Sequence, residues 1–281
     1  RMREANNLET TDFVATLTHP IAEYVYGVTL PSLAAMFTRL YMEKYGVTER
    51  HLAMVAVKNH DHALLNFFAH LHEKITVEGI LDSPEASTNN PYVSEPLRFF
   101  DCCPVSDGGA CVILASAEAA RKLGKPMVRL AGVGQATDTH AVHEREDPTE
   151  LAAVRLAAQQ SFKMAGVQPA DVSVAELHDA FTILEIVESE EVGFFPKGQG
   201  HLALERGETR LGGRLPINTS GGLKAKGHPV GATGVGQAHE IVLQLRGEAE
   251  KRQVANAKVG FTCNFGGFGN NVVCLTFIRE D

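Results

Sequence analysis

The sequence contains no long apolar run and no cysteine framework. No apolar stretch approaches the ~20 residues of a membrane-spanning helix, and no basic and apolar signal segment opens the chain. The five cysteines are odd in number and show no metal-type spacing, and adjacent Cys102 and Cys103 do not form a disulfide framework. These absences predict a chain without a membrane span in a reducing compartment, the cytoplasm.

The chain also lacks an excess of basic residues. Its formal net charge of −8 argues against binding of nucleic acid or an anionic membrane, because such binders present basic stripes. An anionic small ligand is not excluded, since a few local cations or backbone amides bind one. The 281 residues are 44% hydrophobic and 21% charged, which favours one large or two small globular domains over disorder.

The residue pattern predicts an α/β protein. Helices are expected at residues 31–46 and, after a possible cap at Thr48, at 49–59. Residues 60–98 are rich in His, Asn and Pro and are expected to be irregular. From Phe99 onward, short apolar strands alternate with helices in the βαβ manner. The strands are expected at residues 111–115, 127–132, 172–177, 259–263 and 272–278, and the helices at about 116–124, 147–166, 179–193 and 229–246.

The glycine-rich segment 221–234 is the strongest candidate for chemistry. Its glycines allow tight turns and close approach of a ligand to the backbone. Pro229 stands where a helix is expected to begin, so His228 is predicted at a helix N-terminus, where the dipole keeps the imidazole neutral. A phosphate-binding loop is an alternative, but the Walker ending Gly-Lys-Ser/Thr is absent. A structural loop with an incidental histidine also stays open.

A second candidate segment is 176–181 (ELHDAF). His178 is expected at the carboxyl end of a strand, just before a helix, which is the edge where α/β sheets bind ligands. A histidine that only caps the next helix is the alternative.

A third candidate segment is 263–269 (CNFGGFG). The thiol of Cys263 at the end of a buried strand could carry a proton, and the glycines would leave backbone amides free for an oxyanion. The alternative is an inert core cysteine, which is how we interpret the other four cysteines.

Two His-x-His pairs, His60 with His62 and His70 with His72, invite a metal interpretation. A metal site needs further ligands, and no Cys, Asp or Glu occurs at ligand spacing. We therefore expect no metal and interpret these residues as solvated loop histidines.

The three segments together, in this order, resemble the thiolase superfamily. Residues 178–181 (HDAF) resemble its Asn-Glu-Ala-Phe block, with His in first place as in archaeal and sterol-carrier-protein-type thiolases. Residues 227–229 (GHP) are similar to its Gly-His-Pro block. Cys263 with the glycines after it is similar to its Cys-x-Gly block, except that Phe265 stands where glycine is expected. Residues 25–98 resemble the family's loop region.

This resemblance implies a fold class and a division of the chain. The fold would be α/β with five layers, αβαβα, built from two similar halves and assembled as a homodimer or homotetramer. Residues 1–124 would form the loop region and the end of the first half, and residues 125–281 the whole second half. The family's nucleophilic cysteine lies earlier in the first half, so it is expected on a segment of roughly a hundred residues upstream of residue 1.

The resemblance also implies an activity. The protein would be an acetyl-CoA C-acetyltransferase of lipid metabolism, such as the mevalonate pathway, acting on short-chain 3-ketoacyl-CoA thioesters. Coenzyme-A thioesters would be its substrates, and no cofactor is expected. His228 would take the proton of the nucleophilic cysteine, and the amides of Phe265 and Gly266 would bind the tetrahedral oxyanion. His178 and His228 would bind the enolate oxygen, with Cys263 as the base. Thioester contacts are expected from Gly222, Lys224, Gly227 and Phe181, although Lys224 and Lys226 are equally well interpreted as solvated turn charges.

Two other functions remain open at this point. One is a thiolase-like aldolase, a lyase that cleaves a steroid-type side-chain thioester without a nucleophilic cysteine. A cysteine in the nucleophile context on the upstream segment would favour the thiolase over this aldolase. The other is a non-catalytic lipid-binding or scaffold subunit, against which the joint presence of His178, His228 and Cys263 argues. The resemblance to archaeal thiolases further suggests hydroxymethylglutaryl-CoA synthase and a small zinc-ribbon/OB-fold protein as partners.

Overall fold

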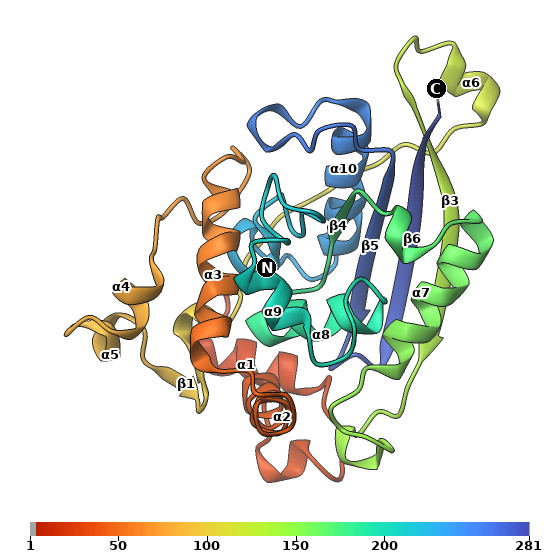
Figure 1. Cartoon of the computed structure of the whole chain (residues 1–281). Helices are drawn as coiled ribbons and strands as arrows, with labels where there is room; N and C mark the ends of the chain where they lie inside the picture. Colours follow the sequence, from red (N-terminus) through yellow and green to blue (C-terminus); the bar gives the residue numbers. More distant parts are fainter. Residues whose placement is uncertain (1–3, 281) are drawn as a thin grey trace.

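A computed structural model of the protein describes residues 4–280 and shows a twisted four-stranded sheet with helices on both faces (Figure 1). The strand order is β3-β6-β5-β4, in which β6 runs antiparallel to both β3 and β5, and β4 pairs parallel with β5. The sheet strands are β3 (Met127–Thr137), β4 (Val174–Glu176), β5 (Val259–Gly266) and β6 (Asn271–Glu280), and a separate hairpin is formed by β1 (Tyr92–Ser94) and β2 (Leu97–Arg98).

Ten α-helices occur in the described part of the chain. Those of the first 125 residues are α1 (Asn7–Ala15), α2 (Leu30–Tyr45), α3 (Glu49–Ala63), α4 (Val77–Leu81), α5 (Ala86–Asn89) and α6 (Ala117–Arg121). Those of the remainder are α7 (Ala152–Ala165), α8 (Thr182–Glu191), α9 (Gly200–Glu205) and α10 (Thr233–Arg246). The predicted mixture of strands and helices is therefore observed, and every sheet strand lies after residue 125.

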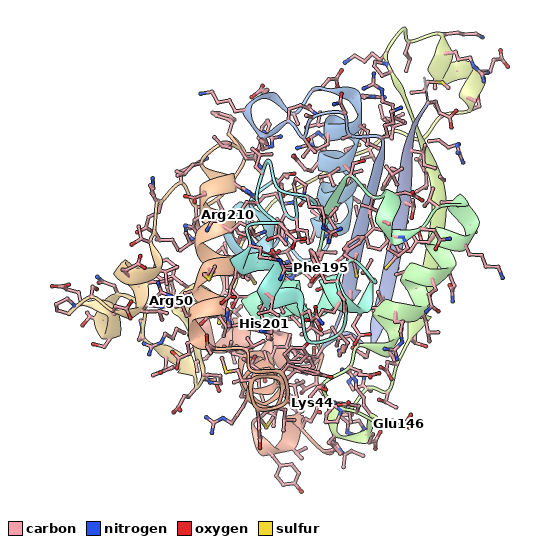
Figure 2. The ribbon with its side chains drawn as sticks, viewed as in Figure 1. Lys44, Arg50, Glu146, Phe195, His201 and Arg210 are labelled. Atoms are coloured by element: carbon pink, nitrogen blue, oxygen red, sulfur yellow. The ribbon has the colours of Figure 1, made fainter. Side chains whose placement is uncertain are left out.

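Helices α7 and α10 cover opposite faces of the sheet (Figure 1). On β5, a Cβ added to Gly260 would meet Ile241 of α10, whereas the next side chain, Phe261, stacks on Phe162 of α7. Because successive side chains of a strand point to opposite faces, this pair fixes which helix lies on which side. Phe195, which is 5% exposed, belongs to the apolar core between the sheet, α7 and α8 (Figure 2). The charged residues Lys44, Arg50 and Glu146 lie on the surface.

The long helix α3 packs beside the sheet domain and against the turn before α10. The Lys58 ammonium donates to the carbonyl of Ile217 at 2.7 Å and pairs with Glu185 of α8 at 2.8 Å. After α3, the amide of His70 donates to the carbonyl of Lys226 at 2.9 Å. These contacts fix the first part of the chain against the glycine-rich segment.

Several of the predicted elements differ from the structure in kind or extent. Residues 111–115 form no strand, because no segment among residues 4–280 pairs with them, and their side chains are exposed. Helix α7 begins at Ala152, not at Asp147, since the Asp147 carboxylate accepts from the Thr149 amide and builds a turn there. Helix α3 runs to Ala63, and the stretch 60–98 that was predicted to be irregular also contains α4, α5 and the β1–β2 hairpin.

Candidate active site

His178 lies at the carboxyl edge of the sheet, as predicted. Strand β4 ends at Glu176 and helix α8 begins at Thr182, and His178 stands between them with 4% of its surface exposed. Its amide donates to Glu188 Oε2 at 2.9 Å, so the second turn of α8 holds the backbone of this residue.

The glycine-rich segment begins with a single turn of π-helix, Gly222–Lys226. Gly221 and Gly222 have φ values of 103° and 60°, a region that favours glycine. A Cβ on Gly222 would lie 2.3 Å from Asp179 Oδ2. That carboxylate accepts from the amides of Leu223 at 2.6 Å and Lys224 at 3.3 Å. Gly222 is therefore needed for the close approach of Asp179, which ties the His178 segment to the His228 segment.

Asp179 is itself held from α3. The side-chain amide of Asn59 donates to Asp179 Oδ2 at 2.7 Å and to Glu185 Oε2 at 3.0 Å. Burial raises the pKa of Asp179 to about 7, and the nearby Glu185 charge adds to the rise. Three segments far apart in sequence thus meet below the two histidines.

The rings of His178 and His228 face each other edge to face. Their centroids are 4.9 Å apart and their planes are perpendicular. The amide of His228 donates to Ser106 Oγ at 3.3 Å, and the amide of Cys103 donates to the carbonyl of Ala180 at 2.9 Å. The segment around residue 105 therefore bridges the two histidine-bearing loops.

One hydrogen bond orients the ring of His228. The Thr233 hydroxyl lies 2.7 Å from His228 Nδ1 and 3.0 Å from the carbonyl oxygen of Pro229. When the hydroxyl donates to Pro229 it accepts from the ring, and the ring proton is then on Nδ1 with the lone pair on Nε2, whereas a hydroxyl that donates to Nδ1 requires the opposite tautomer. Burial, with a smaller effect of the Lys226 charge, lowers the pKa of His228 to about 4. His228 is thus a neutral ring at neutral pH.

The reason for this neutrality differs from the predicted one. The helix was expected to begin at Pro229, but α10 begins at Thr233, and residues 229–232 form a turn. The dipole of α10 acts mainly within its first turn, so it has little effect on a ring five residues earlier. Desolvation, and not the helix terminus, keeps His228 uncharged.

The thiol of Cys263 lies in the core between the sheet and α8, and its partner Glu188 also accepts from the His178 amide. Cys263 is completely buried, and its thiol interacts with Glu188 of α8 and with Cys274, its partner on β6. Burial raises the pKa of this thiol well above its ordinary value. The structure brings His178 and His228 together and directs Cys263 toward the sheet–helix core.

The next two residues of β5 do reach His178. Asn264 Oδ1 lies 2.6 Å from His178 Nδ1, and the Phe265 ring packs on the imidazole with centroids 4.3 Å apart. The Arg279 amide donates to the carbonyl of the opposite Lys258. Hydrogen-bonded and non-hydrogen-bonded pairs alternate along an antiparallel ladder. Because Lys258 belongs to a hydrogen-bonded pair, every second residue after it on β5 does so too, which includes Gly266 and leaves out Phe265. Of the two predicted oxyanion donors, only the Phe265 amide therefore points away from β6, toward the His178 side.

The remaining predicted contact residues are spread over the core and the turn. Phe181 is 7% exposed and packs in the main hydrophobic cluster. Lys224 is 2% exposed and lies over the Phe100 ring at 5.6 Å, so its interpretation as a solvated turn charge is wrong. A Cβ on Gly227 would lie 2.8 Å from Ser106 Oγ. Lys226 is only partly buried, with Nζ 3.5 Å from Glu176 Oε2.

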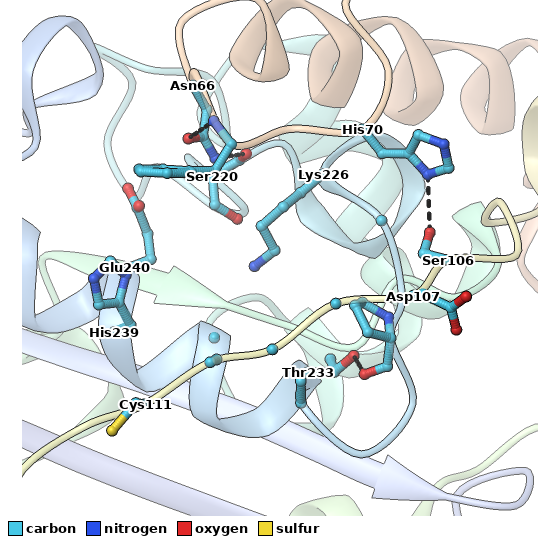
Figure 3. A pocket seen from close by; sticks show the side chains of 18 of the residues that line it. Asn66, His70, Ser106, Asp107, Cys111, Ser220, Lys226, Thr233, His239 and Glu240 are labelled. Atoms are coloured by element: carbon cyan, nitrogen blue, oxygen red, sulfur yellow. Dashed lines mark hydrogen bonds between the residues drawn. The ribbon is translucent and has the colours of Figure 1, made fainter. Parts of the chain in front are cut away.

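A cavity of about 550 Å³ opens beside the His228 turn (Figure 3). Gly227 and Pro229, the neighbours of His228, line it, and the Lys226 side chain extends into it. The cavity therefore adjoins the proposed base and is large enough for part of a thioester. The rest of its lining includes Asn66, Phe68, His70, Ser106, Asp107, Cys111, Ser220, Thr233, His239, Glu240 and Arg252.

The histidine pairs of the first part of the chain behave differently from each other. His70 and His72 are exposed, as predicted, but His60 and His62 are buried in α3, so their interpretation as solvated loop residues is wrong. His62 Nδ1 pairs with the carbonyl of Asn218 at 3.0 Å, and its Nε2 accepts from the Leu211 amide at 3.1 Å. Within residues 4–280, no group of three or more His, Cys, Asp or Glu side chains is arranged to hold a metal ion.

Sequence reasoning did not find Asn264, Thr233 and Glu188. Asn264 and Thr233 lie inside two of the three candidate segments, so the sequence indicated the correct segments but not the residues that orient the rings. Glu188 gave no signal, because a glutamate in an amphipathic helix is expected on the solvent face.

A family model described as "Thiolase C-terminal domain-like" matches residues 134–279. The chain is 45% identical to an acetyl-CoA acetyltransferase of Methanothermobacter thermautotrophicus, an alignment that covers 97% of this chain and 69% of that protein. The chain belongs to the thiolase superfamily. It is 36% identical to human sterol carrier protein 2, over 92% of this chain and 45% of that protein.

A solved structure named Ltp2-ChsH2(DUF35) aldolase superposes with a TM-score of 0.80 at 29% identity, covering 92% of this chain and 65% of that one. The thiolase fold of the chain is thereby confirmed, and the chain spans about two thirds or less of these relatives. In the described part of the chain, no helix has the length and apolar character needed to cross a membrane.

Proposed function

We propose that this chain is the larger part of an acetyl-CoA C-acetyltransferase, which condenses acyl-CoA thioesters or cleaves short-chain 3-ketoacyl-CoA. The observation that carries the proposal is the pair of neutral imidazoles, 4.9 Å apart at the carboxyl edge of the sheet, beside a cavity. Two uncharged bases in a dry site suit a reaction that moves protons to and from carbon and sulfur.

The first step needs a nucleophilic thiolate. His228 Nε2 would take the proton of a cysteine on the upstream segment, which then attacks the thioester carbonyl. The Phe265 amide, which faces the His178 side, is the donor best placed to stabilise the tetrahedral oxyanion. Removing one such donor typically lowers kcat about 10²–10³-fold.

The test uses the full-length protein, including the upstream segment. Cleavage of acetoacetyl-CoA by free coenzyme A is measured for wild type, His228→Ala and the control His140→Ala, an exposed histidine in the loop after β3. Loss of a general base predicts a fall of about 10²–10⁴-fold in kcat/KM for His228→Ala and no change for His140→Ala. Equal rates for wild type and His228→Ala would rule out the proposed role of His228.

A thiolase-like aldolase is the second candidate, because the superposition with the Ltp2-ChsH2(DUF35) aldolase covers 92% of the chain. The two activities differ in their need for free coenzyme A. A lyase cleaves a side-chain thioester to a carbonyl compound and a shorter thioester without it, whereas a thiolase requires it. Cleavage that does not depend on added coenzyme A would favour the lyase.

We further propose the setting in which this enzyme acts. No cofactor is needed for either half-reaction, since coenzyme A enters as substrate. A homodimer or homotetramer in the cytoplasm is expected from the resemblance. Small zinc-ribbon/OB-fold proteins and hydroxymethylglutaryl-CoA synthase are candidate partners, and the two-component name of the Ltp2-ChsH2(DUF35) aldolase supports a small partner protein.

A further inference from the structure

The Ser106 hydroxyl lies beside the His228 turn and contacts three segments of the chain. It accepts from the His228 amide at 3.3 Å, lies 3.0 Å from His70 Nδ1 and is 3.2 Å from the carbonyl oxygen of Pro104. A hydroxyl has one hydrogen and two lone pairs, so it serves all three partners at once when His70 carries its proton on Nδ1. Figure 3 shows the hydrogen bond between His70 and Ser106, two residues that line the cavity.

Close packing holds the Ser106 hydroxyl directly against the backbone of this turn. Val105 and His228 form a parallel β-bridge, which brings the two segments together. Gly227 has a φ of 111°, and a Cβ at this position would lie 2.8 Å from Ser106 Oγ and 3.3 Å from His70 Cβ. Ser106 is only 5% exposed, so water cannot readily replace its hydroxyl. The acceptor of the His228 amide is therefore fixed by the packing around it.

The backbone of His70 is paired with the π-helical turn that precedes this glycine. The His70 amide donates to the carbonyl of Lys226 at 2.9 Å, and the Leu71 amide donates to the carbonyl of Ala225 at 2.9 Å. From this position the exposed imidazole of His70 reaches the Ser106 hydroxyl. The hydroxyl is therefore oriented by a side chain whose own backbone is tied to the same turn.

We propose that Ser106 is a positioning residue that holds the backbone of His228 in place for proton transfer, and that His70 orients the Ser106 hydroxyl. The inference rests on the proposed function, in which His228 takes the proton of the nucleophilic cysteine. A base must lie within hydrogen-bond reach of that proton, about 2.6–3.2 Å between heavy atoms. The Thr233 hydroxyl holds the ring and the Ser106 hydroxyl holds the amide, so the loss of either contact lets the imidazole move out of this range.

The first test compares two buried serines in the full-length protein, with acetoacetyl-CoA cleavage by free coenzyme A as the assay. Displacement of the base in Ser106→Ala predicts a fall of roughly 10–100-fold in kcat, with KM nearly unchanged. Ser161→Ala is the matched control, because Ser161 is also buried and its hydroxyl bonds Thr276 Oγ1 at 2.7 Å, where α7 packs on β6. This variant also loses a buried hydrogen bond, and it should keep the wild-type kcat.

Substitutions of the exposed His70 give a second test, whether or not Ser106→Ala folds. His70→Ala removes a partner of the Ser106 hydroxyl, and the loss of one hydrogen bond predicts a fall of about 3–10-fold in kcat. His70→Asn should restore kcat, because an asparagine Nδ2 lies close to the position of a histidine Nδ1 and donates in the same way. The control is His72→Ala, in which the Asn66 carbonyl loses the His72 ring but keeps the Ala69 amide, so kcat should not change.

A third readout follows the base itself. The rate at which iodoacetamide alkylates the nucleophilic cysteine of the upstream segment reports how readily the thiolate forms. Mass spectrometry of the peptide that carries this cysteine separates its alkylation from that of the other cysteines. A displaced His228 predicts that alkylation in Ser106→Ala is roughly tenfold slower than in wild type. Alkylation in Ser161→Ala should proceed at the wild-type rate.

The inference is overturned by any one of three results. These are an equal kcat for Ser106→Ala and Ser161→Ala, an unchanged alkylation rate in Ser106→Ala, or a His70→Asn variant as slow as His70→Ala. His228→Ala is measured in the same series to separate this failure from that of the proposed function. Wild-type protein that does not cleave acetoacetyl-CoA, or a His228→Ala variant as fast as wild type, would overturn the proposed function and the inference with it.

Discussion

Thr233 is the residue that orients the ring of His228, so Thr233→Val is an informative perturbation. The substitution nearly keeps shape while removing a hydroxyl that lies 2.7 Å from His228 Nδ1 and 3.0 Å from the Pro229 carbonyl oxygen. Thr233 is only 3% exposed, so water cannot readily replace the lost group. A ring with its proton on Nδ1 must then leave Nδ1–H unpaired or shift the proton to Nε2, where it can no longer act as a base.

The size of the effect follows from these two bonds. Each net hydrogen bond contributes about 1 kcal/mol, so the free energy of unfolding should fall by about 2 kcal/mol. The competent tautomer loses about 1–2 kcal/mol relative to the other one. Since 1.36 kcal/mol corresponds to a tenfold change in rate, kcat/KM should fall roughly 5–30-fold.

The assay is acetoacetyl-CoA cleavage by full-length protein, together with urea unfolding. Thr209→Val is the matched control, because Thr209 is equally buried, at 3% exposed, and its hydroxyl has no hydrogen-bond partner within residues 4–280. Removing an unpaired buried hydroxyl should leave activity unchanged and stability unchanged or slightly higher. If Thr233→Val and Thr209→Val were equally active, the tautomer of His228 would not depend on Thr233, and the reasoning would be refuted.

Two further predictions concern stability. Burial lowers the pKa of His62 to about 3 in the folded protein, whereas the same residue has an ordinary histidine pKa in the unfolded chain. As the pH falls, the unfolded chain therefore binds a proton at this residue before the folded protein does. The free energy of unfolding should therefore fall as the pH drops below 6.5, and His62 should account for about 2 kcal/mol of this fall between pH 6.5 and 5. A His62→Gln variant whose stability kept the same pH dependence would contradict this prediction. Gly222→Ala should lower the free energy of unfolding by about 2–4 kcal/mol, because the residue has a positive φ and its new Cβ would overlap the Asp179 carboxylate. Gly231→Ala is the control and should leave the free energy of unfolding unchanged, because open space surrounds that position. Equal urea midpoints for the two alanine variants would show that the π-turn tolerates a side chain.

The fold could be predicted where a local pattern and tertiary packing agree. Helix α2 ends at Gly46 in the left-handed conformation, and β4 and α8 flank His178, as the sequence indicated. Residues 111–115 have the composition of a strand but are not one, because a strand requires a hydrogen-bonded neighbour and composition does not show whether one is present. Asp147 illustrates the opposite case, in which a side-chain hydrogen bond to the next residues delays a helix.

The sequence by itself determined the family, the order of its motifs and the two histidines of the candidate site, because residue type and spacing within a segment are local properties. Only the tertiary structure decided the direction of each side chain. It turned the thiol of Cys263 toward Glu188 and brought Asn264 to His178, although the two residues are adjacent on β5. His60 and His62 are likewise buried in the tertiary structure, although the sequence pattern predicted that they are solvated. Which face of an element is covered depends on what packs against it from elsewhere in the chain, and so does the protonated nitrogen of a buried imidazole.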